Sequence, residues 1–271
     1  MTSTRKIVMS NIYFLTIWQK FNVYEFVEDT HSYFYKGNRV RFSVTQFIGR
    51  FFEEFDSDGI AERYAKKHGL NKDEVLANWE KSGRISSTSG TIIHSHLENL
   101  KRGKRLNHDY SKADEFGIRA EVEERVNILL PKAEAFHADT INKLFPLQME
   151  YTVGYEDFIA GNIDLVCWND YAKQIQIWDY KNVKELSMRH FKGQTCKYPF
   201  HKYQDCNYIH YCIQLNLYKL LLKTILGIDV GDLYLVHFNY TDTTDNFEVT
   251  KCIDLQEECE IALKMLIEEN D

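Results

Sequence analysis

The amino-acid sequence predicts an α/β protein that folds as one compact domain. Patterns typical of strands occur at residues 147–153, 163–168, 174–183 and 231–238. Helical patterns occupy residues 208–226 and 255–269. Only three prolines occur in 271 residues and no Gly/Ser-rich linker interrupts the chain, so we expect a single core of sizeable volume.

The first 88 residues are expected to pack on this core as an elaboration, and residues 89–271 are expected to form the core itself. Two segments rich in aromatic and β-branched residues, 31–36 and 39–44, flank Gly37-Asn38. This pattern predicts a β-hairpin.

Helices are expected between the hairpin and the first core strand. Ser43 and Gln46 have the spacing of a capping box, which predicts that a helix starts there. Further helices are predicted at 59–67, at 72–81, from Ser89-Gly90 onward, and across 114–144 with a break near Pro131.

The net charge of −7 does not exclude a nucleic-acid partner, because the charge is unevenly distributed. Residues 254–271 carry −6, which leaves −1 for the other 253 residues. Residues 182–203 carry +4, and Phe191, Tyr198, Phe200 and Tyr203 interleave with the basic residues Lys184, Arg189, Lys192, Lys197 and Lys202. Cations and aromatic rings together suit single-stranded nucleic acid, whereas a solvated loop is the plain alternative. A second basic cluster, 101–105, is explained equally well by a solvated helix end.

Composition indicates an intracellular protein without a membrane span. No apolar run approaches the roughly 20 residues of a transmembrane helix. The N-terminal stretch to Trp18 lacks a small-residue cleavage site, so a secretory signal is not expected. None of the six cysteines forms a C-x-x-C pair, which favours free buried thiols over a zinc ribbon or an iron–sulfur cluster. We therefore expect a cytoplasmic protein, in the host cytoplasm if the source is viral or phage.

The strand at 174–183 places two charges on one face of an apolar segment. A period of two sets Ile175, Ile177, Asp179 and Lys181 on one side and Gln176, Trp178 and Tyr180 on the other. Unpaired charges on a buried face are costly, and a buried Asp–Lys pair is not an obvious stabiliser. A divalent cation beside the pair would account for both charges.

Six elements that carry chemistry stand in order along the chain: Gly90-x-x-x-His94, Glu150, Gly161-x-x-Asp164, Asp179-x-Lys181, Gln214 and Tyr218. Each has an ordinary explanation when taken alone, such as a helix histidine, a surface glutamate or a turn aspartate. Together they supply two carboxylates for a hard cation and a lysine that can orient an attacking water. That equipment is typical of metal-assisted phosphodiester hydrolysis.

This ordered set resembles the RecB-like branch of the PD-(D/E)xK nuclease superfamily over residues 90–218. The stretches 79–90 and 205–218 are most similar to phage and large-virus exonucleases and to the mitochondrial genome maintenance exonuclease. The resemblance implies a restriction-endonuclease-like core, in which a central mixed β-sheet is flanked by helices. It also implies DNA cleavage with Mg²⁺ or Mn²⁺. Asp179 stands where many superfamily members have Glu, and Asp164 follows Ile163 rather than Pro; both features are usual in this branch.

The resemblance also implies a role for each site residue. Asp164, Asp179, His94 and the backbone carbonyl of Tyr180 would ligate the metal, and Glu150 would support that site or a second ion. Lys181 would position the water and help to neutralise the phosphate, while Gln214 and Tyr218 would contact DNA or brace Lys181. Oxygen ligands favour Mg²⁺ or Mn²⁺, and a histidine ligand favours Mn²⁺.

The sequence thus predicts a metal-dependent DNA nuclease, more specifically an exonuclease acting on single-stranded ends in replication, recombination or repair. A replication or recombination protein is the candidate protein partner. Two alternatives stay open: a structure-dependent or CRISPR-adaptation-like endonuclease, and a DNA-binding module without turnover. The segment 182–203 is expected to line the DNA path.

Overall fold

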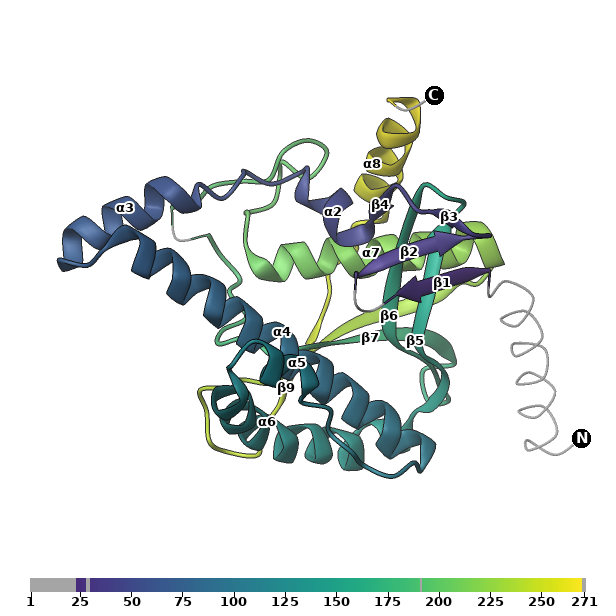
Figure 1. Ribbon diagram of the computed structural model, residues 1–271. Coiled ribbons are helices and arrows are strands. Elements are labelled where there is room, and N and C mark those ends of the chain that lie inside the picture. The colour runs from purple at the N-terminus through teal and green to yellow at the C-terminus, as the bar shows by residue number, and fades with distance from the viewer. Residues whose placement is uncertain (1–22, 28–29, 191, 270–271) are drawn as a thin grey trace, which may run out of the picture.

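A central mixed β-sheet with helices on both faces forms the core of the protein (Figure 1). The computed structural model describes residues 23–27, 30–190 and 192–269. A small N-terminal sheet contains β1 (Tyr24–Val27), β2 (Ser32–Tyr35) and β3 (Asn38–Arg39). The central sheet contains β4 (Phe42–Ser43), β5 (Phe145–Tyr155), β6 (Ile159–Asn169), β7 (Gln174–Lys181), β8 (Val230–His237) and β9 (Glu248–Lys251). The predicted fold class is confirmed.

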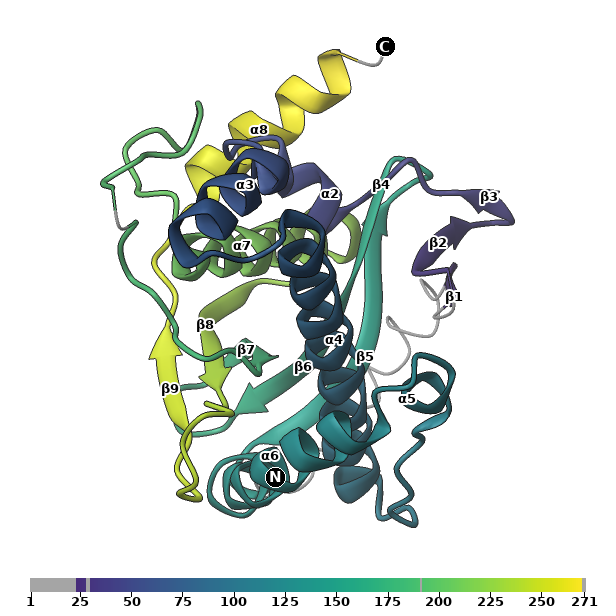
Figure 2. The same cartoon turned by 60° about the vertical axis from the view of Figure 1, so that its left-hand side comes forward.

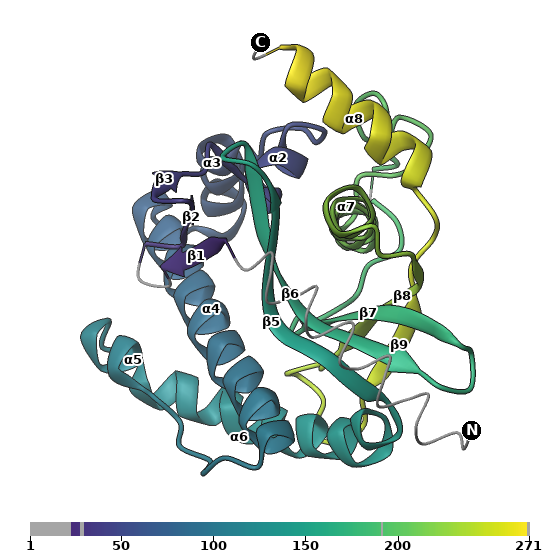
Figure 3. The same ribbon diagram turned by 90° about the vertical axis from the view of Figure 1, so that its right-hand side faces the viewer.

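The helices form two layers, one on each face of the central sheet (Figure 3). Their bounds are α2 (Val44–Gly49), α3 (Ser57–His68), α4 (Lys72–Arg102), α5 (Ser111–Glu115), α6 (Arg119–Asp139), the short 3₁₀ helix η1 (Ile141–Lys143), α7 (Asn207–Leu226) and α8 (Gln256–Glu268). One hydrophobic cluster joins α2, α7 and α8 to the sheet, and a second joins α4 and α6 to it. Each helix layer therefore buries one face of the sheet.

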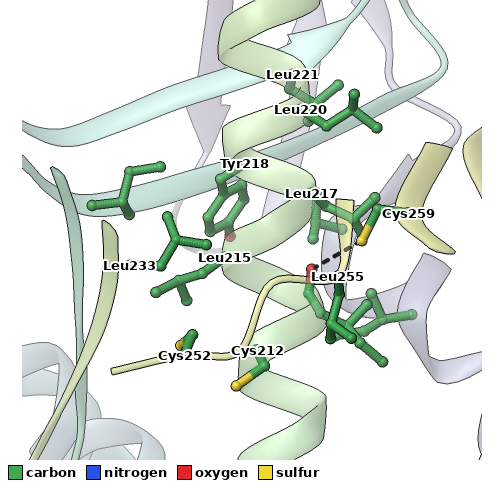
Figure 4. Close-up of a cluster of buried hydrophobic side chains, with 14 of the residues drawn as sticks. Cys212, Leu215, Leu217, Tyr218, Leu220, Leu221, Leu233, Cys252, Leu255 and Cys259 are labelled. Carbon is green, nitrogen blue, oxygen red and sulfur yellow. Dashed lines mark hydrogen bonds between the residues drawn. The ribbon is translucent and has the colours of Figure 1, made fainter. Parts of the chain in front are cut away.

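The apolar layer around α7 also contains most of the cysteines (Figure 4). All six are free and buried, as the sequence predicted. The Cys259 thiol donates to the backbone carbonyl of Ile213, 3.9 Å away (Figure 4). These thiols pack as small apolar side chains.

The N-terminal hairpin is present, but its turn lies one residue earlier than predicted. Tyr35 pairs with Asn38, so Lys36 and Gly37 are the two turn residues, and both have positive φ, 49° and 84°. Two positive φ values define the type I′ turn that matches the twist of a two-residue hairpin. The second predicted strand divides into β3 and β4, and β4 pairs with β6 in parallel. The capping box of Ser43 and Gln46 is confirmed at the start of α2.

Two predicted helix breaks are wrong. The helices expected at 72–81 and from Ser89 onward are one helix, α4, which runs without interruption past residue 88 (Figure 2). Pro131 lies inside α6 instead of ending it. In both helices a buried apolar face continues through the break, and such packing outweighs the cost of a glycine or proline.

Candidate active site

The strand pairing of the central sheet is interrupted beside Asp164. Strand β5 pairs with one edge of β6 along almost its whole length. On the other edge, β4 pairs with residues 159–160 and β7 with residues 165–169. Among the described strands none pairs with residues 161–164 on this edge. At this gap the Asp164 carboxylate replaces a backbone acceptor: its Oδ2 accepts the backbone N–H of Tyr180 in β7 at 2.7 Å.

Glu150 lies across from Asp164 in the neighbouring strand, since the register pairs Met149 with Leu165 and Tyr151 with Ile163. Its backbone has φ 50°, which is rare for a residue other than glycine. The alternation predicted for residues 147–153 fails at this point. Met149 packs with the α6 cluster, whereas Tyr151 packs with the α7 cluster.

His94 reaches these two carboxylates from α4. Its Nδ1 lies 3.4 Å from Asp164 Oδ1 and 3.6 Å from Glu150 Oε1. One ligand atom of each of the three residues lies within 4.8 Å of the other two. The amide of Asn162 supports the group, because its Nδ2 donates to Glu150 Oε2 at 2.5 Å.

The three groups shift each other's pKa values. Burial lowers the pKa of His94, but the charges of Asp164 and Glu150 outweigh it and raise that pKa well above its ordinary value. Burial raises the pKa of Asp164, yet His94 and Lys181 hold it below its ordinary value. Burial raises the pKa of Glu150 more than His94 lowers it. The two carboxylates therefore favour the protonated form of His94.

Asp179 and Lys181 share one face of β7, as the period of two predicted. Their charged groups lie 2.6 Å apart, and Asp179 is 2% exposed. An ion pair should lower the pKa of Asp179 and raise that of Lys181. Only the pKa of Lys181 moves in that direction, because burial outweighs the pair at Asp179 and raises its pKa. The short contact and the raised lysine pKa together support an ion pair with a protonated lysine.

Lys181 is braced from α7. Its Nζ donates to Gln214 Oε1 at 3.4 Å, and Gln214 Nε2 donates to the Tyr218 hydroxyl at 3.0 Å. The Tyr211 ring lies under the same ammonium, 4.6 Å from Nζ to the ring centroid. Gln214 therefore contacts Lys181 directly, and Tyr218, one turn further along the same helix face, acts on it through Gln214.

A cavity of about 580 Å³ brings the predicted residues together. Its lining includes every predicted catalytic and metal-ligating residue and both α7 residues: His94, Glu150, Asp164, Asp179, Tyr180, Lys181, Gln214 and Tyr218. Phe26 of β1 and His31 and Tyr33 of the hairpin line the same cavity and were not predicted as site residues. The pattern at 31–36 predicted a strand but gave no sign that it lies beside residues more than 100 positions away, and Phe26 lay outside the predicted strands.

The basic segment 182–203 is placed differently. Of its described residues only Asn182 lines the cavity. The side chains of Lys184, Arg189, Lys192, Lys197 and Lys202 are exposed outside it, and Lys197 lies 3.7 Å from Glu53. Phe200 is fully buried and packs on Phe51, so the expectation that it stacks on bases is wrong. Phe191 lies outside the described residues.

The donor set fits a hard divalent cation. Two carboxylates and one imidazole are suitable ligands for Mn²⁺ or Mg²⁺. Asp179 Oδ2 is buried and lies 2.6 Å from Lys181 Nζ, so the charge of this carboxylate is already paired inside the protein. The tight group consists of His94, Glu150 and Asp164, while Asp179 faces Lys181 beside it.

Comparisons with known proteins give no family for this chain. No protein-family model and no curated protein matches it. The solved structure reported as the crystal structure of SSO0001 is similar over 72% of this chain and 87% of that chain, with 13% identity and a TM-score of 0.29. A score of this size carries no argument about fold or function. Among the residues that the structure describes, no helix is both long and apolar enough to cross a membrane.

Proposed function

We propose that this protein is a divalent-metal-dependent deoxyribonuclease that acts on single-stranded DNA ends. The observation that supports the proposal most is the convergence of His94, Glu150 and Asp164 beside the Asp179–Lys181 pair in one cavity. A cation bound there would offset charge on a phosphate and lower the pKa of a bound water. The resemblance of the ordered motifs to the RecB-like PD-(D/E)xK nucleases supports the same activity.

Lys181 has the chemistry of a positioning and charge-neutralising group. Burial lowers its pKa, but the charges of Asp179 and Asp164 outweigh burial and raise it, which favours the protonated lysine over a general base. A lysine ammonium has three N–H donors. Gln214 and Asp179 lie where they accept two of them, which leaves one donor for a water or a phosphate oxygen and fixes its direction. Preorganised donors of this kind stabilise developing charge without reorganisation.

Cleavage assays with Mn²⁺ and Mg²⁺ on labelled strands test the proposal. Asp179→Ala and Lys181→Ala are each expected to lower the rate by about 10²–10³ or more while the protein stays folded. Lys66→Ala is a matched control, since Lys66 is exposed and outside the cavity. Wild-type rates in folded Lys181→Ala would overturn the assignment.

Substrate form separates the alternatives. An exonuclease requires a free end, so it should degrade linear single strands and leave circular single strands intact. Cleavage of circular or branched DNA would favour the structure-dependent endonuclease. Binding without turnover in either metal would favour the DNA-binding module.

The ligand set can be tested by anomalous scattering from crystals soaked in Mn²⁺. The sequence predicts His94, Asp164 and Asp179 as side-chain ligands, whereas the tight group in the structure contains Glu150. A peak within 2.5 Å of a carboxylate oxygen, roughly the range for oxygen ligands, identifies which acid takes part. A peak among Cys196, Cys206 and Cys212 would contradict both sets.

A further inference from the structure

A second pocket borders the candidate active site at the N-terminal hairpin. It encloses about 440 Å³ between the hairpin, the start of α2 and Asp157. His31 and Tyr33 line both this pocket and the candidate active site, so the two share one wall. We call the second space the hairpin pocket.

The hairpin pocket carries positive charge. Arg39 and Arg41 line it, and both are exposed, against the single carboxylate of Asp157. Arg39 is held in place because its Nη2 donates to Ser32 Oγ at 3.3 Å. The backbone N–H of Arg41 donates to the Asp157 carbonyl at 2.8 Å. Guanidinium groups with several N–H donors suit phosphate oxygens.

The shared wall is aromatic. Phe26 and Tyr33 stack with ring centroids 4.8 Å apart, and the exposed His31 meets Phe26 edge-on at 5.1 Å. Tyr33 reaches the candidate active site, because it lines that cavity as well. Burial, together with the charges of Glu150 and Asp164, raises its pKa to about 12. Rings at this position can stack on a nucleobase. A base within a duplex keeps both faces covered by its neighbours, whereas an unpaired base offers a free face.

The rival path along residues 182–203 has less support. That segment lines the candidate active site only through Asn182, and its Phe200 is buried. The hairpin instead combines arginines and rings on the rim of the cavity that holds the carboxylates.

We propose that the hairpin pocket binds the nucleotide next to the scissile phosphate of a single DNA strand, with its phosphate on Arg39 and Arg41 and its base against His31. The inference rests on the proposed nuclease function and adds the path of the strand. It makes the hairpin the element that selects an unpaired end.

Binding without divalent metal tests the proposal apart from cleavage. Fluorescence anisotropy with a labelled oligothymidylate in EDTA gives the dissociation constant at several salt concentrations. The double variant Arg39→Gln/Arg41→Gln should bind more weakly and lower the salt slope by about 1.4, since each lost contact to a single strand removes about 0.7. Lys66→Gln/Lys67→Gln on α3 removes the same charge from exposed residues outside both pockets and should change neither quantity. Thermal unfolding verifies that both variants fold.

Stacking has its own readout. A strand with 2-aminopurine near its end should lose fluorescence on binding, and His31→Asn should restore part of it. Asparagine tolerates the positive φ of 45° at this position, so the backbone is retained. An unchanged affinity and salt slope in the double arginine variant, or an effect equal to that of the lysine control, would overturn the hairpin path. Cleavage by the wild type would in that case leave the nuclease proposal standing. If the arginines bind the strand but Mn²⁺ supports no cleavage, the nuclease proposal is contradicted and the binding site in the hairpin pocket is supported.

Discussion

At the scale of single residues, the direction of the Lys181 ammonium depends on contacts behind it. Gln214 accepts from Lys181 and donates to Tyr218, so the glutamine transmits the position of a buried tyrosine to the lysine. We predict that Gln214→Leu lowers kcat about tenfold, less than Lys181→Ala, because the ion pair with Asp179 persists. Tyr218→Phe should cost less again, and the double variant should cost less than the two effects combined. Wild-type kcat in Gln214→Leu would show that the brace has no role.

The positive φ of Glu150 is a backbone feature of the candidate site. A left-handed residue in a strand costs about 1–2 kcal/mol, and asparagine tolerates it better than a β-branched residue does. We predict that Glu150→Val has a free energy of unfolding at least about 1 kcal/mol lower than Glu150→Asn, measured in urea. Both variants remove the same charge, so the loss of charge cancels in their difference. Equal stabilities would mean that the strand relaxes at no cost.

At Glu150 the sequence pattern no longer predicts the local structure. Asp179 and Lys181 could be placed on one face because the period of two holds in a regular strand. Glu150 adopts a positive φ without being a glycine or asparagine that would signal it, so its neighbours Met149 and Tyr151 were assigned to one face when they pack on two. The contact between His31 and the cavity depends on pairing between distant segments, which no local pattern encodes.

At the scale of elements, two motif glycines have different surroundings. A Cβ at Gly161 would lie 2.7 Å from Tyr218 Cε1 and 3.0 Å from Val44 Cγ2, both in the core. A Cβ at Gly90 would meet the Asn182 amide at 3.3 Å, which the end of a side chain can accommodate by a small shift. We predict that Gly161→Ala destabilises the protein by about 1–3 kcal/mol and lowers kcat through Tyr218, whereas Gly90→Ala does neither to that extent. Similar losses in both variants would contradict this difference.

Helix length was predicted less well than helix position. The sequence placed the start of α2 correctly because a capping box is a local signal. It divided α4 and broke α6 because glycine and proline have poor intrinsic propensity, yet buried residues on both sides of each break hold the helix together. Because α4 is continuous, His94 lies on the same helix as the residues that pack against α3 (Figure 1).

At the scale of the whole molecule, the candidate site is assembled from β1, the hairpin, α2, α4, the strands β5, β6 and β7, and α7. The gap in the sheet between β4 and β7 exists only when the N-terminal β4 pairs with β6. The N-terminal elaboration is therefore part of the site's construction and not merely packed on a finished core. This dependence could not be predicted, because the two residues of β4 carry no signal for a parallel partner more than 100 positions away.

The stability of the whole molecule should depend on pH through groups far from the site. Burial and the charge of Lys101 lower the pKa of His137 on α6, and its Nε2 is buried without a hydrogen bond in the described structure. The unfolded histidine binds its proton with a pKa of about 6.5, higher than in the folded state. The stabilising preference for neutral His137 is therefore fully present above that pH, and it is lost as the pH falls below it.

We predict that His137→Gln loses less stability than the wild type between pH 7.5 and 5.5, measured by urea unfolding at several pH values. Contributions from other titrating groups are the same in both proteins and cancel in the difference. Asp179 is one such group, and its raised pKa acts in the opposite direction. Parallel pH curves would show that His137 does not contribute to this dependence.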